Sequence, residues 1–235
     1  MKNTFETGTI DTGTRSHIRA RSGAVVTRFA ALLSAITLCA GLTGCSFLKP
    51  AKATARHFVL TPMPATGPAQ AASNSLAVGL GKVKLPAYLF NTSLAVRKGT
   101  NEIEYLPSAL WAERLDTGFQ RVLAANLAIV LSTDRIHLSA WKRDEVAGEV
   151  YVTLEQFDVD ASGTGVLVAR WRVLSPGGDK VLKAGSARLS RQGPPPDPGV
   201  SGAIATLSEL VADFSRQLAQ AVQENVPRQA ALLPR

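Results

Sequence analysis

Apolar residues along the chain either alternate with polar ones or recur every three to four positions, in segments separated by proline- and glycine-rich stretches. The alternating and short apolar segments predict β-strands. They lie at residues 56–61, 76–85, 94–97, 102–105, 135–141, 150–155, 167–173 and 181–189. Residues 98–101 separate two of these segments as a hairpin turn, and the last three segments predict an antiparallel meander. In the segment 76–85, a glycine permits a slip of register before Val83.

Two longer segments have helical spacing instead. Between about residues 109 and 131, one stripe contains Trp111, Leu115, Phe119, Val122, Leu123, Leu127 and Val130. Ser108 is the predicted N-cap, and Gly118 within the helix would admit close packing. A second stripe, from Ser201 to about residue 225, contains Ile204, Leu207, Val211, Phe214, Leu218, Ala221 and Val222, and Pro227 follows it. Both stripes predict amphipathic helices with one face on a core.

The order of these elements predicts the fold. Strands, a helix, further strands and a last helix follow one another with no internal repeat. We therefore expect a single mixed α/β domain over residues 56–226, in which one mixed, largely antiparallel sheet is covered by two amphipathic helices. The first helix would serve as a right-handed crossover between early and late strands. Residues 227–235 would form a C-terminal tail.

The start of the chain has the pattern of an exported lipoprotein. Four arginines precede an uncharged apolar run at residues 29–42, which is too short to span a hydrocarbon core of ~30 Å as a helix. The run ends in Leu42-Thr43-Gly44-Cys45, where small residues lead directly to a cysteine. This order predicts a lipoprotein signal peptide over residues 1–44, acylation of Cys45 and a lipidated tether over residues 45–55. The alternative is a plain signal peptide followed by a buried or reactive cysteine.

The residue after Cys45, the cysteine positions and the charge add further expectations. Ser46 is not an acidic retention signal, so we expect the outer membrane, where several acyl chains anchor more firmly than one. Cys39, the other of the two cysteines, lies in the predicted signal, so the mature chain would form no disulfide and no cysteine-ligated metal site. Of the 26 basic and 18 acidic residues, five basic and two acidic ones lie in the predicted signal. The mature chain would therefore carry a dispersed net charge of 21 minus 16, or +5, which suggests an anionic neighbour such as a lipid surface or an acidic partner. Nucleic acid is not an expected partner of an exported protein.

The candidate chemical residues do not form a recognisable catalytic, metal or cofactor motif. His57 and His137 lie in separate strand-like segments and lack ligand or acid–base spacing. Gly79-Leu-Gly81-Lys82 is similar to a phosphate loop, but Val83 stands where Ser or Thr is required and no helix follows. We interpret these glycines as interruptions within a strand and not as a phosphate-binding loop. Asp158 and Asp160 are expected on one solvated strand face near a turn.

The segment Arg170-Trp171-Arg172 has two interpretations. It could present a basic stripe to a partner or to lipid phosphates. Alternatively, the arginine stems pack over apolar surface while their charged ends reach water. An exposed Leu/Val face on this strand would instead favour a homo-oligomer, which we expect for this protein.

Three short motifs together point to a known family. They are Leu85-Pro-Ala-Tyr-Leu89, Trp111-Ala-Glu-Arg-Leu115 and Leu123-Ala-Ala-Asn-Leu127. With the cysteine motif and the strand that begins Phe58-Val-Leu-Thr-Pro62, the chain resembles the ABC-type transport auxiliary lipoproteins, in particular those of the paraquat-inducible PqiABC system. The chain departs from the family pattern at Phe90-Asn91-Thr92 and at Leu110.

The resemblance implies a role in transport without catalysis. Such lipoproteins lie on the periplasmic face of the outer membrane and work with a periplasmic MCE-domain protein and inner-membrane transporter components to move lipids or other hydrophobic molecules. The implied structural or partner-contact residues are Pro86, Tyr88, Trp111, Glu113 and Asn126. Pro86 would end a strand, Tyr88 would pack on or cap the turn, Trp111 would lie in the core, and Asn126 would make a polar contact on a helix face. The other hypotheses are an envelope hydrolase or lipid-modifying enzyme, and a structural envelope lipoprotein.

Overall fold

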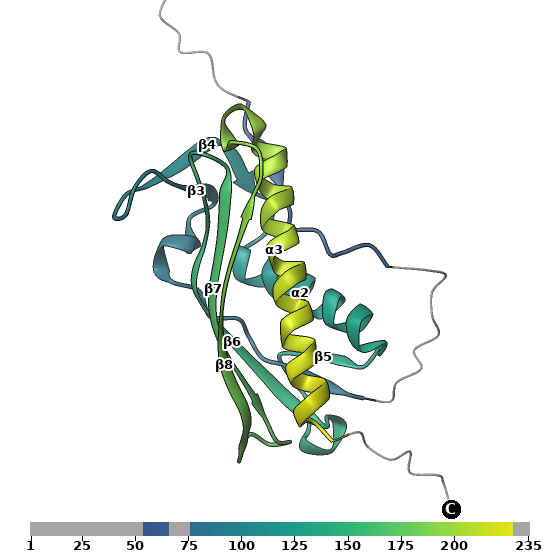
Figure 1. Ribbon diagram of the computed structural model, residues 1–235. Helices are drawn as coiled ribbons and strands as arrows, with labels where there is room; N and C mark the ends of the chain where they lie inside the picture. Colours follow the sequence, from purple (N-terminus) through teal and green to yellow (C-terminus); the bar gives the residue numbers. More distant parts are fainter. Residues whose placement is uncertain (1–53, 66–75, 228–235) are drawn as a thin grey trace, which may run out of the picture. The chain divides into compact units, whose positions relative to one another are not determined.

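The computed structural model describes residues 54–65 and 76–227 of the 235-residue chain. The predicted signal peptide and Cys45 lie outside these residues. Among the described residues, the elements in chain order are β1 (Arg56–Phe58), β2 (Val78–Leu80), the 3₁₀ helix η2 (Ala87–Phe90), β3 (Ser93–Arg97), β4 (Ile103–Trp111), α2 (Leu115–Leu131), β5 (Ile136–Leu138), the 3₁₀ helix η3 (Arg143–Glu145), β6 (Gly148–Asp160), β7 (Thr164–Leu174), β8 (Val181–Gln192) and α3 (Pro196–Asn225). Figure 1 shows their arrangement.

All of these strands belong to one mixed sheet, organised around the long strand β6. β2 pairs with β6 in parallel at Gly148–Val150, and β3 pairs with it in parallel at Val159–Asp160. On the other side of β6, β7 pairs antiparallel along almost the whole strand, and β8 pairs antiparallel with β7. β4 pairs antiparallel with β3, while β1 pairs in parallel with β4 and β5 with β2. The predicted mixed sheet and antiparallel meander are therefore confirmed.

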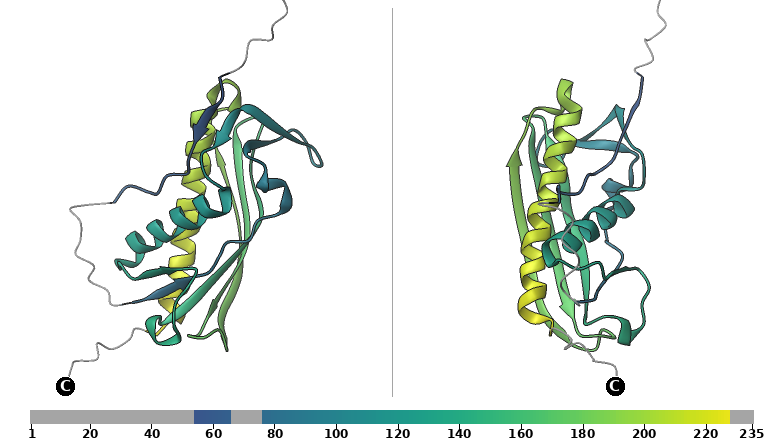
Figure 2. Two further views of the ribbon diagram at one scale, coloured as in Figure 1. Left: turned by 180° about the vertical axis from the view of Figure 1, so that it is seen from behind. Right: turned by 90° about the vertical axis from the view of Figure 1, so that its right-hand side faces the viewer.

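The two α-helices of the described chain pack on the same face of this sheet, as Figure 2 shows. Phe119 of α2 contacts Phe157 of β6 edge-to-face, with the ring centroids 5.3 Å apart, and its ring also lies 6.4 Å from that of Phe214 on α3. All three rings are fully buried, as are Leu123 and Leu127. The predicted stripes thus form the core, except for Val130 and Trp111, which are only half-buried. Trp111 was expected in the core but ends β4 beside an open hollow. Burial of the apolar stripes is the main stabilising contribution.

The start of the first helix differs from the prediction. Residues 109–111 belong to β4, and α2 begins at Leu115 with Arg114 as its N-cap, so Ser108 does not cap the helix. Leu110 pairs with Ser93, and Trp111 pairs with Phe58. The backbone of this stretch of β4 pairs with β1 on one side and with β3 on the other. These hydrogen bonds outweigh the apolar spacing, which is also compatible with a helix. The last helix is irregular at its start, with non-helical backbone angles at Asp197 and Gly199, so its regular part begins close to the predicted Ser201.

The shorter strands also end earlier than predicted. The segment 76–85 forms a ladder only at Val78–Leu80, after which the Gly81 N–H donates to the Val150 carbonyl at 2.9 Å and the Lys84 N–H to the Val152 carbonyl at 3.0 Å. The expected slip of register at a glycine is thus present. α2 connects β4 with β5, which are not neighbours in the sheet, so it crosses the sheet face rather than joining adjacent parallel strands.

None of the helices in the described part of the chain has the length and apolar character needed to cross a membrane.

Candidate functional site

Two of the three motifs come together at one place on the surface. The motif around Tyr88 forms η2, and the motif beginning at Trp111 forms the end of β4 and the link to α2. The two segments are joined where the Trp111 N–H donates to the Thr92 carbonyl at 2.7 Å. Between them lies a hollow of about 250 Å³, lined by Leu89, Phe90, Asn91, Thr92, Trp111, Ala112, Glu113, Arg114 and Leu115. We call Phe90, Trp111, Glu113 and Arg114 the motif surface.

An exposed aromatic ring marks this surface. Pro86 is extended and precedes the single turn η2, which closes with a hydrogen bond from the Leu89 N–H to the Pro86 carbonyl at 3.0 Å. The turn buries Leu89 and leaves Phe90 54% exposed. The guanidinium of Arg114 lies 5.6 Å from the centre of the Phe90 ring, within the range of a cation–π contact. An aromatic side chain and an arginine are thus presented together to solvent.

Charged groups order the other half of the motif surface. Arg114 also forms an ion pair with Asp116 at 2.7 Å, and its hydrogen bond lowers the pKa of that carboxyl. Glu113 accepts a hydrogen bond from Arg121 at 2.5 Å. A Cβ added at Gly118 would come within 3.0 Å of the Glu113 carboxylate, so this glycine does allow close packing, as expected.

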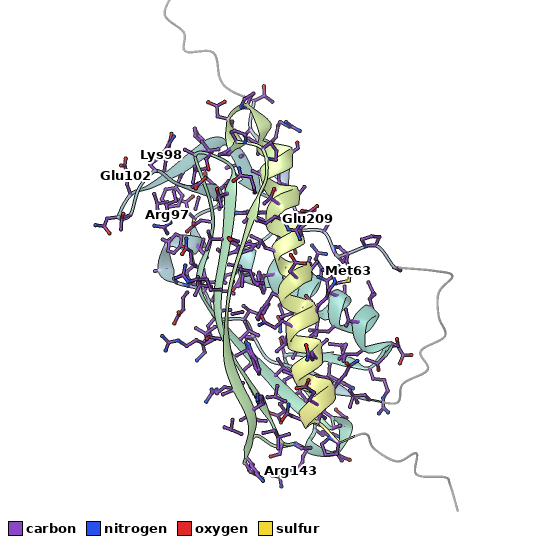
Figure 3. All side chains as sticks on the ribbon, viewed as in Figure 1. Met63, Arg97, Lys98, Glu102, Arg143 and Glu209 are labelled. Carbon is purple, nitrogen blue, oxygen red and sulfur yellow. The ribbon has the colours of Figure 1, made fainter. Side chains whose placement is uncertain are left out.

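A buried polar network supports η2 from beneath. Asp158 of β6 is only 1% exposed. Its carboxylate accepts hydrogen bonds from the Tyr88 hydroxyl at 2.8 Å, from Arg97 Nη2 at 2.7 Å and Nε at 3.1 Å, and from Gln156 Nε2 at 2.9 Å. Arg97 lies near the β3–β4 hairpin, as Figure 3 shows. Burial raises the pKa of Tyr88, and the neighbouring Asp158 charge raises it further.

The expectation that Asp158 is solvated is therefore wrong. The segment containing Tyr88 folds back over β6 and covers the carboxylate, and the chain also ties this segment down through a hydrogen bond from the Tyr105 hydroxyl to the Tyr88 carbonyl at 2.9 Å. Asp160, two residues along, is half-buried and accepts hydrogen bonds from Ser162 and Thr164 in the adjoining turn. Tyr88 itself belongs to the turn η2, and its hydroxyl donates to the buried carboxylate of Asp158.

The third motif lies away from this surface. Asn126 is fully buried on α2. Its Oδ1 accepts a hydrogen bond from the Met63 N–H at 2.8 Å, and its Nδ2 donates to Ser215 Oγ of α3 at 3.2 Å. Met63 is labelled in Figure 3. Asn126 therefore links the N-terminal segment and both helices inside the protein, where a helix-face polar contact was expected.

The remaining candidates are dispersed. His57 lies on β1 and His137 on β5, at opposite ends of the strand order, and the described residues contain no group of histidines, cysteines and acids able to hold a metal ion. Arg170 and Arg172 are both exposed, whereas Trp171 between them is buried in the core. Both interpretations of this strand place the charged ends of the arginines in solvent, and the structure shows them there, with Arg170 paired to Glu155 at 2.6 Å.

Sequence analysis named Phe90 only as a departure from the family pattern and Arg114 only as part of a motif, and it did not predict that the two residues share a surface. It also missed the grouping of Tyr88, Arg97 and Asp158, which are far apart in the chain and share no local spacing. The sequence signal that could have indicated Phe90 is its position, a large apolar residue directly after a motif that ends a strand.

Comparison with known proteins identifies the family. A family model for the ABC-type transport auxiliary lipoprotein component matches residues 58–219, which is most of the chain. The chain belongs to this family. This auxiliary lipoprotein is thus a component of an ABC-type transport system, and a lipoprotein of this kind is membrane-anchored in the cell envelope. No curated protein matches it in sequence.

Solved structures show that the auxiliary lipoprotein shares its fold with distant proteins. An uncharacterized protein is 18% identical, with a TM-score of 0.59 over 72% of this chain and 99% of that one. The DUF330 protein XCC0632 from Xanthomonas campestris is 11% identical, with a TM-score of 0.60 over 73% of this chain and 96% of that one. At these identities the likeness concerns the fold alone.

Proposed function

We propose that this protein is the outer-membrane lipoprotein subunit of an MCE-type intermembrane transport system for lipids or other hydrophobic molecules. In this proposal it acts by binding a periplasmic MCE-domain partner and has no catalytic step of its own. Cys45 is its acylated N-terminus after removal of residues 1–44, and residues 45–55 connect the anchor to the folded domain. That tether would reach ~35 Å at full extension, which sets how far the domain stands from the membrane.

The observation that carries the proposal is the motif surface. Two segments that resemble family motifs meet there, and they present Phe90 and Arg114 side by side. Aromatic residues and arginine are enriched at the energetically important centres of protein interfaces. A docking site must also keep its shape before the partner arrives, because ordering on binding lowers affinity. The buried contact of Tyr88 with Asp158 and Arg97 supplies that rigidity.

The other surface that supports assembly is the edge strand β8. In the described part of the chain it pairs with β7 alone, so the backbone groups along its other side have no strand partner. Unpaired edges of this length favour pairing with another chain. We therefore propose that copies of the protein associate through β8, while the motif surface stays available to the MCE-domain partner.

A crosslinking experiment in living cells tests the docking surface. A photoreactive benzoyl-phenylalanine placed at Phe90 should form an adduct with the MCE-domain protein of the same transport system, identified by mass spectrometry. The matched control places the same group at Leu138, which is comparably exposed but lies on β5 at the far end of the sheet. Equal capture of the MCE-domain protein from both positions, or from neither, would contradict the proposal.

Loss-of-function data separate docking from catalysis. Phe90→Ala should weaken rescue of envelope resistance to detergents in a deletion strain, while Leu138→Ala should rescue fully. Substitutions His57→Gln and His137→Gln should also rescue fully, because neither histidine contributes to the motif surface. Complete loss of rescue from either histidine change in a folded protein, together with hydrolysis of an envelope substrate in vitro, would favour an enzyme instead.

A further inference from the structure

The sheet face opposite the helices carries a second site, bordered by basic side chains. A hollow of about 450 Å³ lies over β6 and β7, and its lining includes Lys82, Lys84, Tyr151, Arg170 and Arg172. We call these five residues the cationic hollow. A neighbouring hollow of about 630 Å³ shares Lys82, Lys84, Tyr151 and Arg172 with it. Figure 2 shows that α2 and α3 lie on the other face of the sheet.

The two lysines are positioned by the backbone along β6. Gly81 and Lys84 donate hydrogen bonds to the carbonyls of Val150 and Val152, so this stretch lies against β6 like a short irregular strand. Val83, between the lysines, is buried in the core. Because successive side chains of an extended segment point to opposite sides, Lys82 and Lys84 both extend from the face opposite α2 and α3. The two arginines extend from the same face of β7, on either side of the buried Trp171.

The glycines of the Gly79-Leu-Gly81-Lys82 segment have a specific role at this site. A Cβ at Gly81 would come within 2.6 Å of the Tyr151 ring, and one at Gly79 within 2.5 Å of the Trp141 indole. Glycine at these two positions therefore leaves the space that the two aromatic rings occupy. The sequence of this segment is similar to a phosphate loop, but the segment lacks the geometry of one. Its glycines instead make room for two aromatic rings beside the basic side chains.

The charges at the site leave a positive excess. Arg170 is paired with Glu155 at 2.6 Å. Glu149, which lines the neighbouring hollow, is 4% exposed, and its carboxylate is satisfied by neutral donors, namely Trp141 Nε1, the Tyr151 hydroxyl and the Gly177 N–H. Among the described residues, Lys82, Lys84 and Arg172 form no ion pair with any acid.

We propose that the cationic hollow binds the headgroup of an anionic phospholipid, with its phosphate between Lys82, Lys84 and Arg172. Several unpaired cations around one hollow match an anionic phosphate, which accepts charge-assisted hydrogen bonds from both residue types. The hollow has the size of a small-molecule site rather than of a single ion, and the rings of Tyr151 and Trp141 offer apolar contact to the glycerol and first methylene groups. This inference goes beyond docking, since it concerns other residues than the motif surface and a ligand other than the partner.

The test is direct titration of the mature lipoprotein, purified in a non-ionic detergent, by isothermal calorimetry. The probes are dihexanoyl-phosphatidylglycerol, dihexanoyl-phosphatidylcholine and inorganic phosphate. Phosphatidylglycerol should bind about tenfold or more tightly than either of the others, because only it combines net negative charge with apolar groups. The double substitution Lys82→Gln with Lys84→Gln should weaken this binding by about tenfold or more. Arg172→Gln, a second variant at the same hollow, should weaken it as well.

The charge-matched control is Lys98→Gln with Arg188→Gln, which removes two cations outside the hollow. It should bind phosphatidylglycerol like the parent protein. Equal binding of phosphatidylcholine, equal binding of inorganic phosphate, or an equal loss in the control variant would overturn the assignment. All substituted residues are exposed, so circular dichroism should show each variant folded. No MCE-domain partner is present in this assay, so its failure would leave the docking proposal to the crosslinking experiment.

Discussion

The substitution Asp158→Asn tests whether the buried network beneath η2 holds the motif surface in place. Asparagine keeps the shape of the side chain but removes the negative charge that accepts hydrogen bonds from Tyr88 and from both donor positions of Arg97. It also places an N–H group where one of these donors now points. The change therefore leaves a cation without its counter-ion next to a site that is almost inaccessible to water.

The expected magnitude follows from burial. Removing one partner of a buried ion pair costs about 3–5 kcal/mol of unfolding free energy. The Arg97 side chain is 26% exposed, so water solvates part of its charge once the carboxylate is gone. We therefore expect a loss at the lower end, about 3 kcal/mol. Urea denaturation, with the slope unchanged, measures this loss as a shift of the midpoint.

Asp160→Asn is the matched control, two residues along the same strand. Asp160 accepts hydrogen bonds from the backbone N–H groups of Ser162 and Thr164, and an asparagine oxygen can still accept them. This variant should lose about 1 kcal/mol or less. The reasoning is refuted if Asp158→Asn loses less than about 1 kcal/mol or no more than the control. Combining Asp158→Asn with Arg97→Met should show a loss smaller than the sum of the single losses, because the two side chains share one interaction.

Three further predictions concern the core, the tyrosine and the anchor. Leu123→Ala should cost about 2–5 kcal/mol by denaturation, since Leu123 is fully buried between helix and sheet, and an unchanged midpoint would show that this face is free for an interface. The raised pKa of Tyr88 means that the folded state resists its ionisation, so stability should be unaffected by this group below pH 10.0, its ordinary pKa, and should fall above it. Tyr88→Phe should reduce that alkaline slope in thermal unfolding scans, and an identical slope would assign the effect to other groups. Cys45→Ala should release an unacylated or unprocessed protein from the membrane fraction, and a processed Cys45→Ala protein that still partitions into detergent would contradict the anchor.

The meander and the last helix could be predicted from the sequence because the spacing of their apolar residues matches the faces that the structure buries. In β6 and β7, residues such as Val150, Val152 and Val173 alternate with polar neighbours, and the structure buries the apolar set against α3. The stripe on α3 likewise faces the core along its length. When one face of a helix or strand is buried and the other is exposed to solvent, the periodicity of its apolar residues alone identifies the element.

The predicted start of α2 was wrong because local spacing did not decide it. Residues 109–111 fit the helical stripe, but β1 and β3 both hydrogen-bond to this stretch of β4. Such pairing depends on segments distant in the chain, and tertiary context overrides local preference. The same reason explains Asp158. Its position near a turn predicted a solvent-exposed side chain, but Tyr88 and Arg97, which are distant in the chain, hydrogen-bond to it and cover it.

The sequence by itself determined the fold class, the core stripes and the motifs that indicate a transport auxiliary lipoprotein. All of these depend on residues close together in the chain. Only the tertiary structure decided which motif residues share a surface, which carboxylate is buried, and that Lys82, Lys84 and Arg172 border one hollow. These are consequences of which strands lie side by side, and strand order in a mixed sheet is set by the packing of the whole domain rather than by any local pattern.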